Sequence, residues 1–233
     1  MDDKLFRLLD VGCGEGGASD GFVKEGFECT GIDIEDLGYP YLFIKSDIRE
    51  LNPENFKYYY DVIWISMPCR DFCLFAKRFG STWKKNPPNP ERGLFLIDVA
   101  VKFAKAAEPR FWIMENVPEV AEYFGPARFT TALRGERQMV RSFWGNFPEF
   151  LMPRDNKNMV MRYRPECNKK EQVINKASKR AKIPLCVSQA FAKACKEVLE
   201  NTKCLQCRGE ITHPHISKNY CLSCLSEGSC GVK

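Results

Sequence analysis

The chain has 233 residues, a net charge of +5 and a hydrophobic content of 44%. This length suits one α/β domain with a small appendage, and this hydrophobic content excludes an intrinsically disordered chain. The sequence has no run of about 18 apolar residues, and its acidic first residues do not resemble a secretion signal. We therefore expect a cytoplasmic protein without a membrane partner.

Short apolar segments alternate with amphipathic helical segments along the chain. The predicted strands are Lys4–Asp10, Glu28–Ile34, Tyr41–Ile44, Asp61–Ser66 and Arg110–Met114, and Val140–Phe150 is compatible with a strand and a turn. The predicted helices are Ser19–Gly26, Pro90–Ala107 and Ile183–Leu199. This alternation is typical of an α/β fold, in which a doubly wound, mostly parallel sheet is covered by helices on both faces.

A polar or reactive residue stands at or just after the end of each predicted parallel strand. These residues are Asp10, Asp33, Asp47, Cys69 and Glu115. Because ligands of such sheets bind at the carboxyl ends of the strands, the pattern predicts that one rim of the sheet carries the chemistry.

The first strand leads into a glycine-rich turn, LDVGCGEGG, that precedes a helix. Glycines let the backbone approach a ligand closely. Asp33 can accept hydrogen bonds from both ribose hydroxyls, and Asp47 can accept one from an adenine amino group. The pattern predicts a nucleoside cofactor, either a dinucleotide or S-adenosylmethionine, and a purely structural turn is the alternative. The order Gly12-x-Gly14-x-Gly16 differs from the G-x-G-x-x-G order of dinucleotide sites.

Pro68 and Cys69 directly follow the apolar run that ends at Ser66. A cysteine thiolate is a strong nucleophile with an adjustable pKa, so Cys69 is a candidate for covalent catalysis. Glu115 at the end of the next predicted strand is the candidate acid. The alternatives are an inert buried thiol and a solvated carboxylate.

The last part of the chain is rich in basic residues and then in cysteines. Arg154 to Lys182 contains ten Lys or Arg and three Asp or Glu, and this stretch either faces phosphates or is a solvated surface. Five of the twelve cysteines fall in the last 30 residues.

Two C-x-x-C pairs, separated by 13 residues, predict a zinc site in the tail. Four thiolates bind zinc tetrahedrally, and the metal can supply the folding energy of so short a segment. The predicted ligands are Cys204, Cys207, Cys221 and Cys224. The alternatives are a redox pair, disulfides, or a site in which His213 or His215 replaces one cysteine. We expect a zinc ribbon in residues 201–233 after a catalytic domain in residues 1–200.

Four motifs follow one another: LDVGCGEGGASDGFVKEGFECTGIDIED, SDIREL, SMPCRDF and MENV. In this order they resemble the DNA cytosine-5 methyltransferases, above all the small members found in archaeal and bacterial viruses. The likeness covers roughly residues 5–150, weakens towards about residue 200 and leaves out the tail. It implies a Rossmann-like, class I S-adenosylmethionine-dependent methyltransferase domain that acts on DNA in a prokaryotic or virus-infected cell.

The resemblance also implies roles for residues at matching positions. Residues that would contact S-adenosylmethionine are Asp10, Gly12, Gly14, Asp33, Ile34, Asp47, Ile48 and Pro68. Catalytic residues would be Cys69, Glu115 and Arg141. Residues that would contact the substrate are Arg70, Asn116 and Arg164.

The chain departs from the family pattern at several positions. Met67 stands in place of the usual second proline, and Arg70 in place of a common glutamine. The family's Gln-x-Arg-x-Arg strand has only approximate matches, one ending at Arg141 and one at Arg164. A large target-recognition domain is absent, which affects the expected sequence specificity more than the chemistry.

The predicted reaction is transfer of a methyl group to carbon 5 of cytosine in DNA through a covalent Cys69 adduct. Two alternatives remain open. One is methylation of RNA or of a modified pyrimidine. The other is a nucleic-acid-binding protein that keeps the fold without catalysis.

Overall fold

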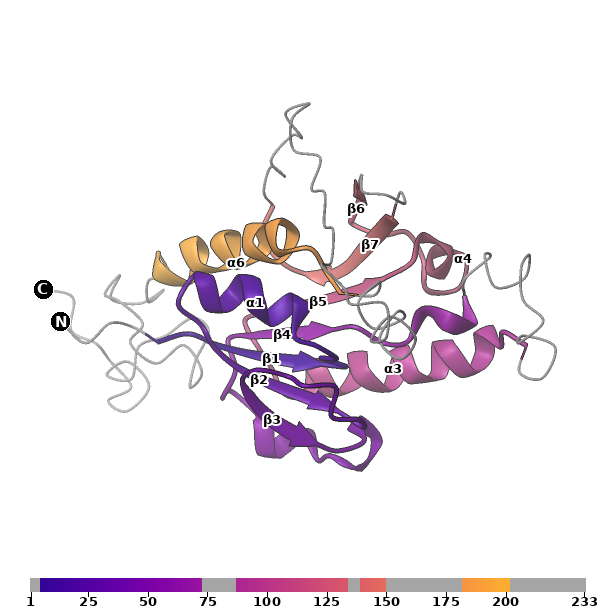
Figure 1. Ribbon diagram of the computed structural model, residues 1–233, viewed down its shortest axis with the longest axis horizontal. Helices are drawn as coiled ribbons and strands as arrows, with labels where there is room; N and C mark the ends of the chain where they lie inside the picture. Colours follow the sequence, from indigo (N-terminus) through magenta and orange to yellow (C-terminus); the bar gives the residue numbers. More distant parts are fainter. Residues whose placement is uncertain (1–4, 73–86, 134–138, 150–181, 202–233) are drawn as a thin grey trace, which may run out of the picture.

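The computed structural model describes residues 5–72, 87–133, 139–149 and 182–201 of the chain. In these residues the strands form one seven-stranded sheet (Figure 1). The strands are β1 Arg7–Val11, β2 Glu28–Asp33, β3 Leu42–Lys45, β4 Val62–Ile65, β5 Phe111–Asn116, β6 Phe129–Leu133 and β7 Met139–Asn146. The α-helices in the same residues are α1 Gly17–Lys24, α3 Pro90–Ala106, α4 Ala121–Phe124 and α6 Leu185–Glu200.

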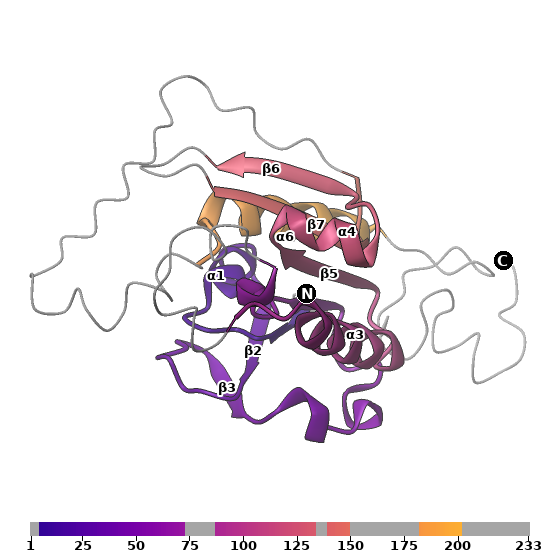
Figure 2. The same ribbon diagram turned by 90° about the vertical axis from the view of Figure 1, so that its right-hand side faces the viewer.

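The strand order in the sheet is β3-β2-β1-β4-β5-β7-β6. Strands β1 to β5 are parallel, while β7 runs antiparallel to both β5 and β6. Figure 2 shows β6 and β7 at one end of the sheet and β3 at the other. This mixed sheet with helices on both faces is a Rossmann-like, doubly wound α/β fold.

Alternate residues of the central strands pack into two separate hydrophobic cores, as expected for a sheet that is covered on both faces. Leu9 and Ile63 belong to the core beneath α3. Leu8 and Trp64 belong to the core beneath α1 and α6. The face that a residue occupies therefore follows from its position in the strand.

Helix α6 lies against α1, although the two are far apart in the sequence (Figure 1). The close approach depends on Gly21 of α1, where an added Cβ would lie 2.3 Å from the Ser188 hydroxyl and from the Gln189 nitrogen. Lys196 of α6 donates a 2.8 Å hydrogen bond to the carbonyl of Glu25 at the end of α1. The contact covers the helix that follows the glycine-rich turn.

The predicted elements are confirmed in order and type, with shifted bounds. Strand β1 extends one residue beyond the expected end at Asp10, and β5 includes Glu115 and Asn116, so the expectation that these two residues follow their strand is wrong. The strand expected within Val140–Phe150 is β7, which passes through Gly145 and ends at Asn146. Strand β6 was not predicted, since FTTAL is short and lies in a segment of weak signal.

Several predicted sites lie outside the described residues. These are Arg164, most of the basic stretch, and the four tail cysteines with the zinc ribbon. Within the described ranges no group of three or more His, Cys, Asp or Glu side chains could hold a metal ion. No helix in the same ranges is long and apolar enough to cross a membrane.

Candidate active site

The glycine-rich turn after β1 is shaped by two close approaches. Gly12 has φ +73°, and an added Cβ would lie 2.4 Å from the carbonyl oxygen of Ser66, so only glycine fits there. Gly14 has φ +49°, and its backbone amide donates a 3.0 Å hydrogen bond to the Asp33 carboxylate. An added Cβ on Gly14 would meet nothing within 4 Å, so the turn presents open backbone to a ligand.

Asp10 lies beneath this turn and is 1% exposed. The Ser19 hydroxyl donates a 2.7 Å hydrogen bond to its Oδ2, and the Tyr39 hydroxyl lies 2.7 Å from the Ser19 oxygen. Among the described residues nothing contacts Asp10 Oδ1 as a hydrogen-bond partner. Burial raises the pKa of Asp10 to about 7. A buried carboxylate oxygen of this kind fits a cationic ligand group such as the ammonium of an amino acid.

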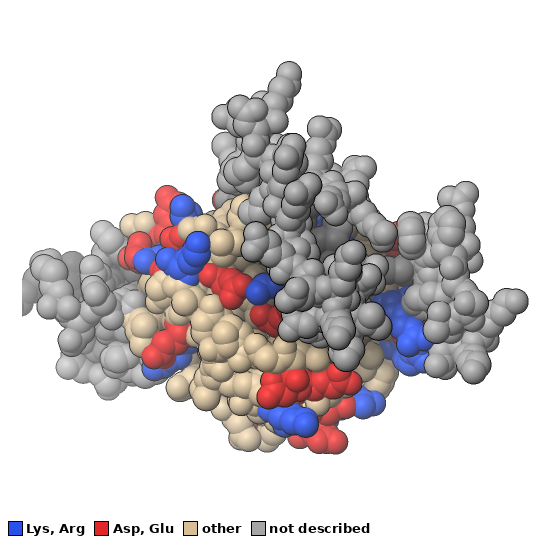
Figure 3. Space-filling view, in the orientation of Figure 1, with Lys and Arg blue, Asp and Glu red and all other residues tan. Residues whose placement is uncertain are grey.

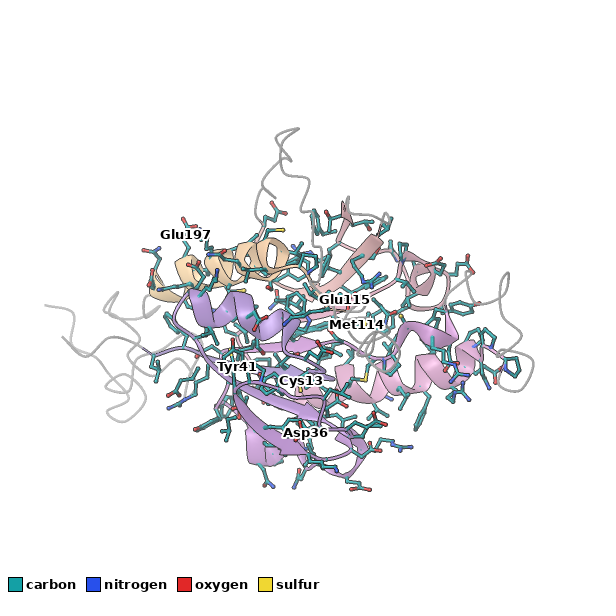
Figure 4. All side chains as sticks on the ribbon, viewed as in Figure 1. Cys13, Asp36, Tyr41, Met114, Glu115 and Glu197 are labelled. Carbon is teal, nitrogen blue, oxygen red and sulfur yellow. The ribbon has the colours of Figure 1, made fainter. Side chains whose placement is uncertain are left out.

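The ends of β2 and β3 supply the side chains predicted to hold a nucleoside. Asp33 is half-buried, Ile34 is 61% exposed and Ile48 is buried. Figure 3 shows acidic side chains gathered in the lower part of the view, where Figure 4 labels Asp36. This part of the rim suits hydroxyl and amino donors better than phosphates.

Asp47 is more engaged than the sequence indicates. Its Oδ1 caps a short 3₁₀ helix, Ile48–Glu50, by accepting a 2.9 Å hydrogen bond from the Arg49 amide. The Arg49 guanidinium also donates to both carboxylate oxygens, at 2.9 and 3.0 Å. These hydrogen bonds lower the pKa of Asp47 to about 2. Asp47 is therefore a carboxylate over the usual pH range. The hydrogen bonds from Arg49 occupy part of its capacity to accept from a ligand.

Cys69 begins the 3₁₀ helix η3, Cys69–Asp71, directly after β4. Its side chain is half-buried and packs against the core beneath α3, while Pro68 and Arg70 are exposed. Cys69 is therefore not a fully buried thiol, and Arg70 beside it is open to solvent. Asp71, the last residue of η3, accepts hydrogen bonds from the Asn89 amide at 3.1 Å and from Arg92 Nε at 2.9 Å.

Glu115 forms a buried ion pair with Arg141. The carboxylate lies 2.7 Å from Arg141 Nε, and both side chains are about nine-tenths buried, with exposures of 9% and 11%. The register explains the contact, because Glu115 of β5 pairs with Phe143 of β7 and Arg141 is two residues away on the same face. Figure 4 shows Glu115 in the centre of the molecule. The alternative of a solvated acid at a strand end is wrong.

The pKa of Glu115 is raised to about 7, mainly by burial. Arg141 opposes this shift, while the thiolate form of Cys69 adds to it through charge repulsion. The Cys69 sulfur and the Glu115 carboxyl are therefore near enough for their charges to interact. A carboxyl group with a pKa near 7 can donate a proton at neutral pH.

Asn116 has a different place from the one the sequence suggested. It is 1% exposed, its amide nitrogen donates a 3.0 Å hydrogen bond to the Met67 carbonyl, and its amide oxygen accepts one from the Val117 nitrogen at 2.9 Å. These bonds favour a role in holding the turn before Cys69 over a direct substrate contact.

The family model of C-5 cytosine-specific DNA methylases matches residues 6–125, which is just over half of the chain. The chain belongs to this family. A curated relative, the type II methylase M.HgiDII of Herpetosiphon aurantiacus, is 26% identical over 172 residues. The match covers 66% of this chain and 46% of that protein, so the chain spans less than half the length of this relative.

Solved structures of other methyltransferases are similar to this DNA methylase family member at low identity. A prophage protein of E. coli, described as a DNA modification methyltransferase, is 18% identical with a TM-score of 0.40, covering 60% of this chain and 46% of the other. The S. pombe Dnmt2 methyltransferase is 15% identical with a TM-score of 0.42, covering 61% and 50%. The Spodoptera frugiperda DNMT2 mutant is 16% identical with a TM-score of 0.37, covering 69% and 56%.

Several residues that support the candidate site could not be recognised in the sequence. Ser19 hydrogen-bonds to Asp10 and Tyr39 to Ser19, Ser66 lowers the pKa of Glu115, and Arg92 hydrogen-bonds to Asp71. Serine, tyrosine and arginine are common in any sequence, and nothing in their spacing indicates these contacts. The β7 arginine was found only through the approximate family motif.

Proposed function

We propose that the chain is a DNA cytosine-5 methyltransferase that uses S-adenosylmethionine. The observation that carries the proposal is the buried Glu115–Arg141 pair, whose carboxyl is near enough to Cys69 for their charges to interact. Addition to a pyrimidine ring requires a nucleophile and an acid that can reach the same ring.

The cofactor assignment is supported by the polar groups of the rim. Asp10 Oδ1 is suited to the ammonium of the methionine part, and Asp33 to the ribose hydroxyls. Ile34 and Ile48 would pack against the adenine, Asp47 would accept from its amino group, and Pro68 would line the methyl end. When bound, S-adenosylmethionine supplies an electrophilic methyl group.

In the proposed reaction the Cys69 thiolate forms a bond to carbon 6 of cytosine. Glu115 donates its proton to ring nitrogen 3, so the electron pair moves to carbon 5, which would take the methyl group as its bond to the sulfonium sulfur breaks. Removal of the carbon-5 proton by a base then breaks the bond between the Cys69 sulfur and carbon 6, and nitrogen 3 returns its proton to Glu115, so the ring and the acid are both restored. Arg141 holds Glu115 in position through their ion pair. Arg70 and Arg164 would contact the nucleic acid.

The target base has to leave the helical stack before this reaction, at a cost of a few kcal/mol. We propose DNA as the substrate on the basis of the family. Methylation of RNA and binding without catalysis are outcomes of the same test.

The test supplies tritiated S-adenosylmethionine with matched DNA and RNA oligonucleotides. We expect label in DNA, at least 1000-fold less with Cys69→Ser or Glu115→Gln, and near-normal label with the control Cys186→Ser, which changes a half-buried cysteine of α6. The factor of roughly 1000 reflects loss of a group that acts in the covalent step. Label in RNA alone would transfer the proposal to RNA, and no label in either polymer would contradict it.

We also propose that residues 201–233 bind zinc through Cys204, Cys207, Cys221 and Cys224. The support is the two C-x-x-C pairs at a spacing typical of structural zinc sites. Metal analysis of the purified full chain should find about one zinc per chain. Cys204→Ser should lose it and Cys230→Ser should keep it; zinc-free wild-type protein would refute the assignment.

A further inference from the structure

Ser66 connects three strands at the point where the candidate active site begins. It follows β4 directly, and continuation of the β4–β5 register beyond Ile65 and Met114 brings it opposite Glu115. Its backbone nitrogen donates a 2.8 Å hydrogen bond to the carbonyl of Val11 in β1. The backbone of Ser66 is therefore held in place next to Glu115.

The hydroxyl of Ser66 lies between Trp64 and Glu115. Trp64 Nε1 donates a 2.9 Å hydrogen bond to Ser66 Oγ, and on the other side the register places Ser66 opposite Glu115, where hydrogen bonding by its side chain lowers the pKa of the acid. An indole nitrogen can only donate, so Ser66 Oγ accepts from Trp64 and its own proton is left for the carboxylate. The series of hydrogen bonds thus runs from the donor Trp64 to Ser66, and from Ser66 towards Glu115.

Trp64 is held in place by the core beneath α1 and α6. It is fully buried, and its ring centroid lies 5.3 Å from Phe191, 6.0 Å from Phe143 and 6.1 Å from Phe22. Since the indole cannot rotate without disturbing these contacts, it orients the Ser66 hydroxyl. A donor in a chain of this kind is also polarised by the bond it accepts.

The groups that face Glu115 come from four elements besides its own strand. Arg141 of β7 and Ser66 after β4 favour the carboxylate, while Cys69 of η3 and Asp10 of β1 repel it when they are ionised. Burial favours the neutral acid. Ser66 is the one side chain in this set that does not ionise, so it can be replaced without a change of net charge.

We propose that Ser66 is a positioning residue for Glu115, which orients the acid and sets the pH above which it loses its proton. The measurement of activity against pH rests on the proposed methyl transfer, whereas the titration of Glu115 rests only on the contacts among Trp64, Ser66 and Glu115. Trp64 acts through Ser66 by orienting its hydroxyl.

The sign of the expected effect follows from the direction of the bond. Ser66 donates to the ionised form of Glu115, so its removal disfavours the carboxylate and raises the pKa of Glu115. If methyl transfer requires protonated Glu115, the alkaline limb of kcat/KM against pH moves upward in Ser66→Ala. A hydrogen bond to a charged group corresponds to a shift of about one pH unit.

The experiment compares kcat/KM for DNA methylation from pH 5.5 to 9.5 in wild type, Ser66→Ala, Ser66→Gly and Ser66→Thr. Ala and Gly should move the alkaline limb upward, and Thr, which keeps the hydroxyl, should restore it. The control is Ser142→Ala, which removes a buried hydroxyl that lies 2.8 Å from the Thr130 hydroxyl in the β6–β7 pair. This control should leave the limb in place.

A second readout does not depend on catalysis. The Glu115 carboxyl is titrated by carbon-13 NMR in the full chain without nucleic acid, and its signal is assigned by its loss in Glu115→Gln. A higher pKa in Ser66→Ala supports the proposal even if no substrate is methylated, in which case only the proposed function fails. An unchanged Glu115 titration in both Ser66→Ala and Ser66→Gly overturns it, whatever the activity.

Discussion

Two carboxyl groups on one face of the sheet, Asp10 and Glu115, are buried and have pKa values raised to about 7. Their surroundings differ. Glu115 pairs with Arg141, so its charge is compensated inside the protein. Asp10 accepts only from Ser19, and its Oδ1 has no hydrogen-bond partner in the described part of the chain. Residues with such pKa shifts often lie at functional sites. Here the different surroundings make Glu115 the candidate acid and Asp10 the candidate cation-binding group.

Asp10 should make the free protein less stable as the pH rises. Its carboxyl has a pKa of about 7 in the folded protein and about 3.8 as the ordinary value, so the folded state binds more protons between these pH values. Stability therefore falls from pH 4 to 7 and stays lower above that, by up to about 4 kcal/mol. Asp10→Asn removes this loss.

Thermal denaturation of wild type and Asp10→Asn at pH 5 and pH 8 tests this effect. The Tm of Asp10→Asn should exceed that of wild type by more at pH 8 than at pH 5. The control Asp36→Asn, which changes an exposed carboxylate, should differ from wild type in Tm by the same amount at both pH values. An equal difference at the two pH values would count against a buried, ionisable Asp10.

At the scale of elements, η3 and the start of α3 are joined by Asp71. Asp71 accepts from the Asn89 amide and from Arg92, and both partners belong to the beginning of α3. Gly93 lets the two elements approach, since an added Cβ would lie 2.6 Å from the Phe72 ring. The turn that carries Cys69 is therefore anchored to a helix 17 residues long.

Asp71→Asn should weaken this anchor. It keeps the size of the side chain but removes the charge that Arg92 meets. Asp71 is buried but Arg92 is half-exposed, so solvent screens part of the interaction and the loss should be about 1 kcal/mol. Urea denaturation should show that loss, and methyl transfer should fall with it. Asp98→Asn, which breaks an exposed ion pair with Lys102 on the same helix, should cost less than about 0.5 kcal/mol. Equal costs for the two variants would mean that Asp71 does not anchor η3.

At the scale of the whole molecule, the order of strands and helices was predictable because apolar runs and polar strand ends alternate in the first 116 residues. The sequence also indicated Cys69 and Glu115 as neighbours, since parallel strands end at one rim. The contact with Arg141 needed the family motif, because a hairpin that reverses direction brings β7 beside β5. The roles of Ser66 and Asn116 depend on register and rotamer, and single residues in a sequence do not reveal these.

The whole account depends on covalent attack by Cys69 with Glu115 in the same pocket. The most direct measurement uses DNA that contains 5-fluorocytosine, which has no carbon-5 proton to lose, so the adduct cannot resolve. After denaturation and proteolysis, mass spectrometry should find the modified base on the peptide that contains Cys69, and Glu115→Gln should form much less of it. An adduct on another cysteine, or a Glu115→Gln variant that traps DNA as well as wild type does, would contradict the account.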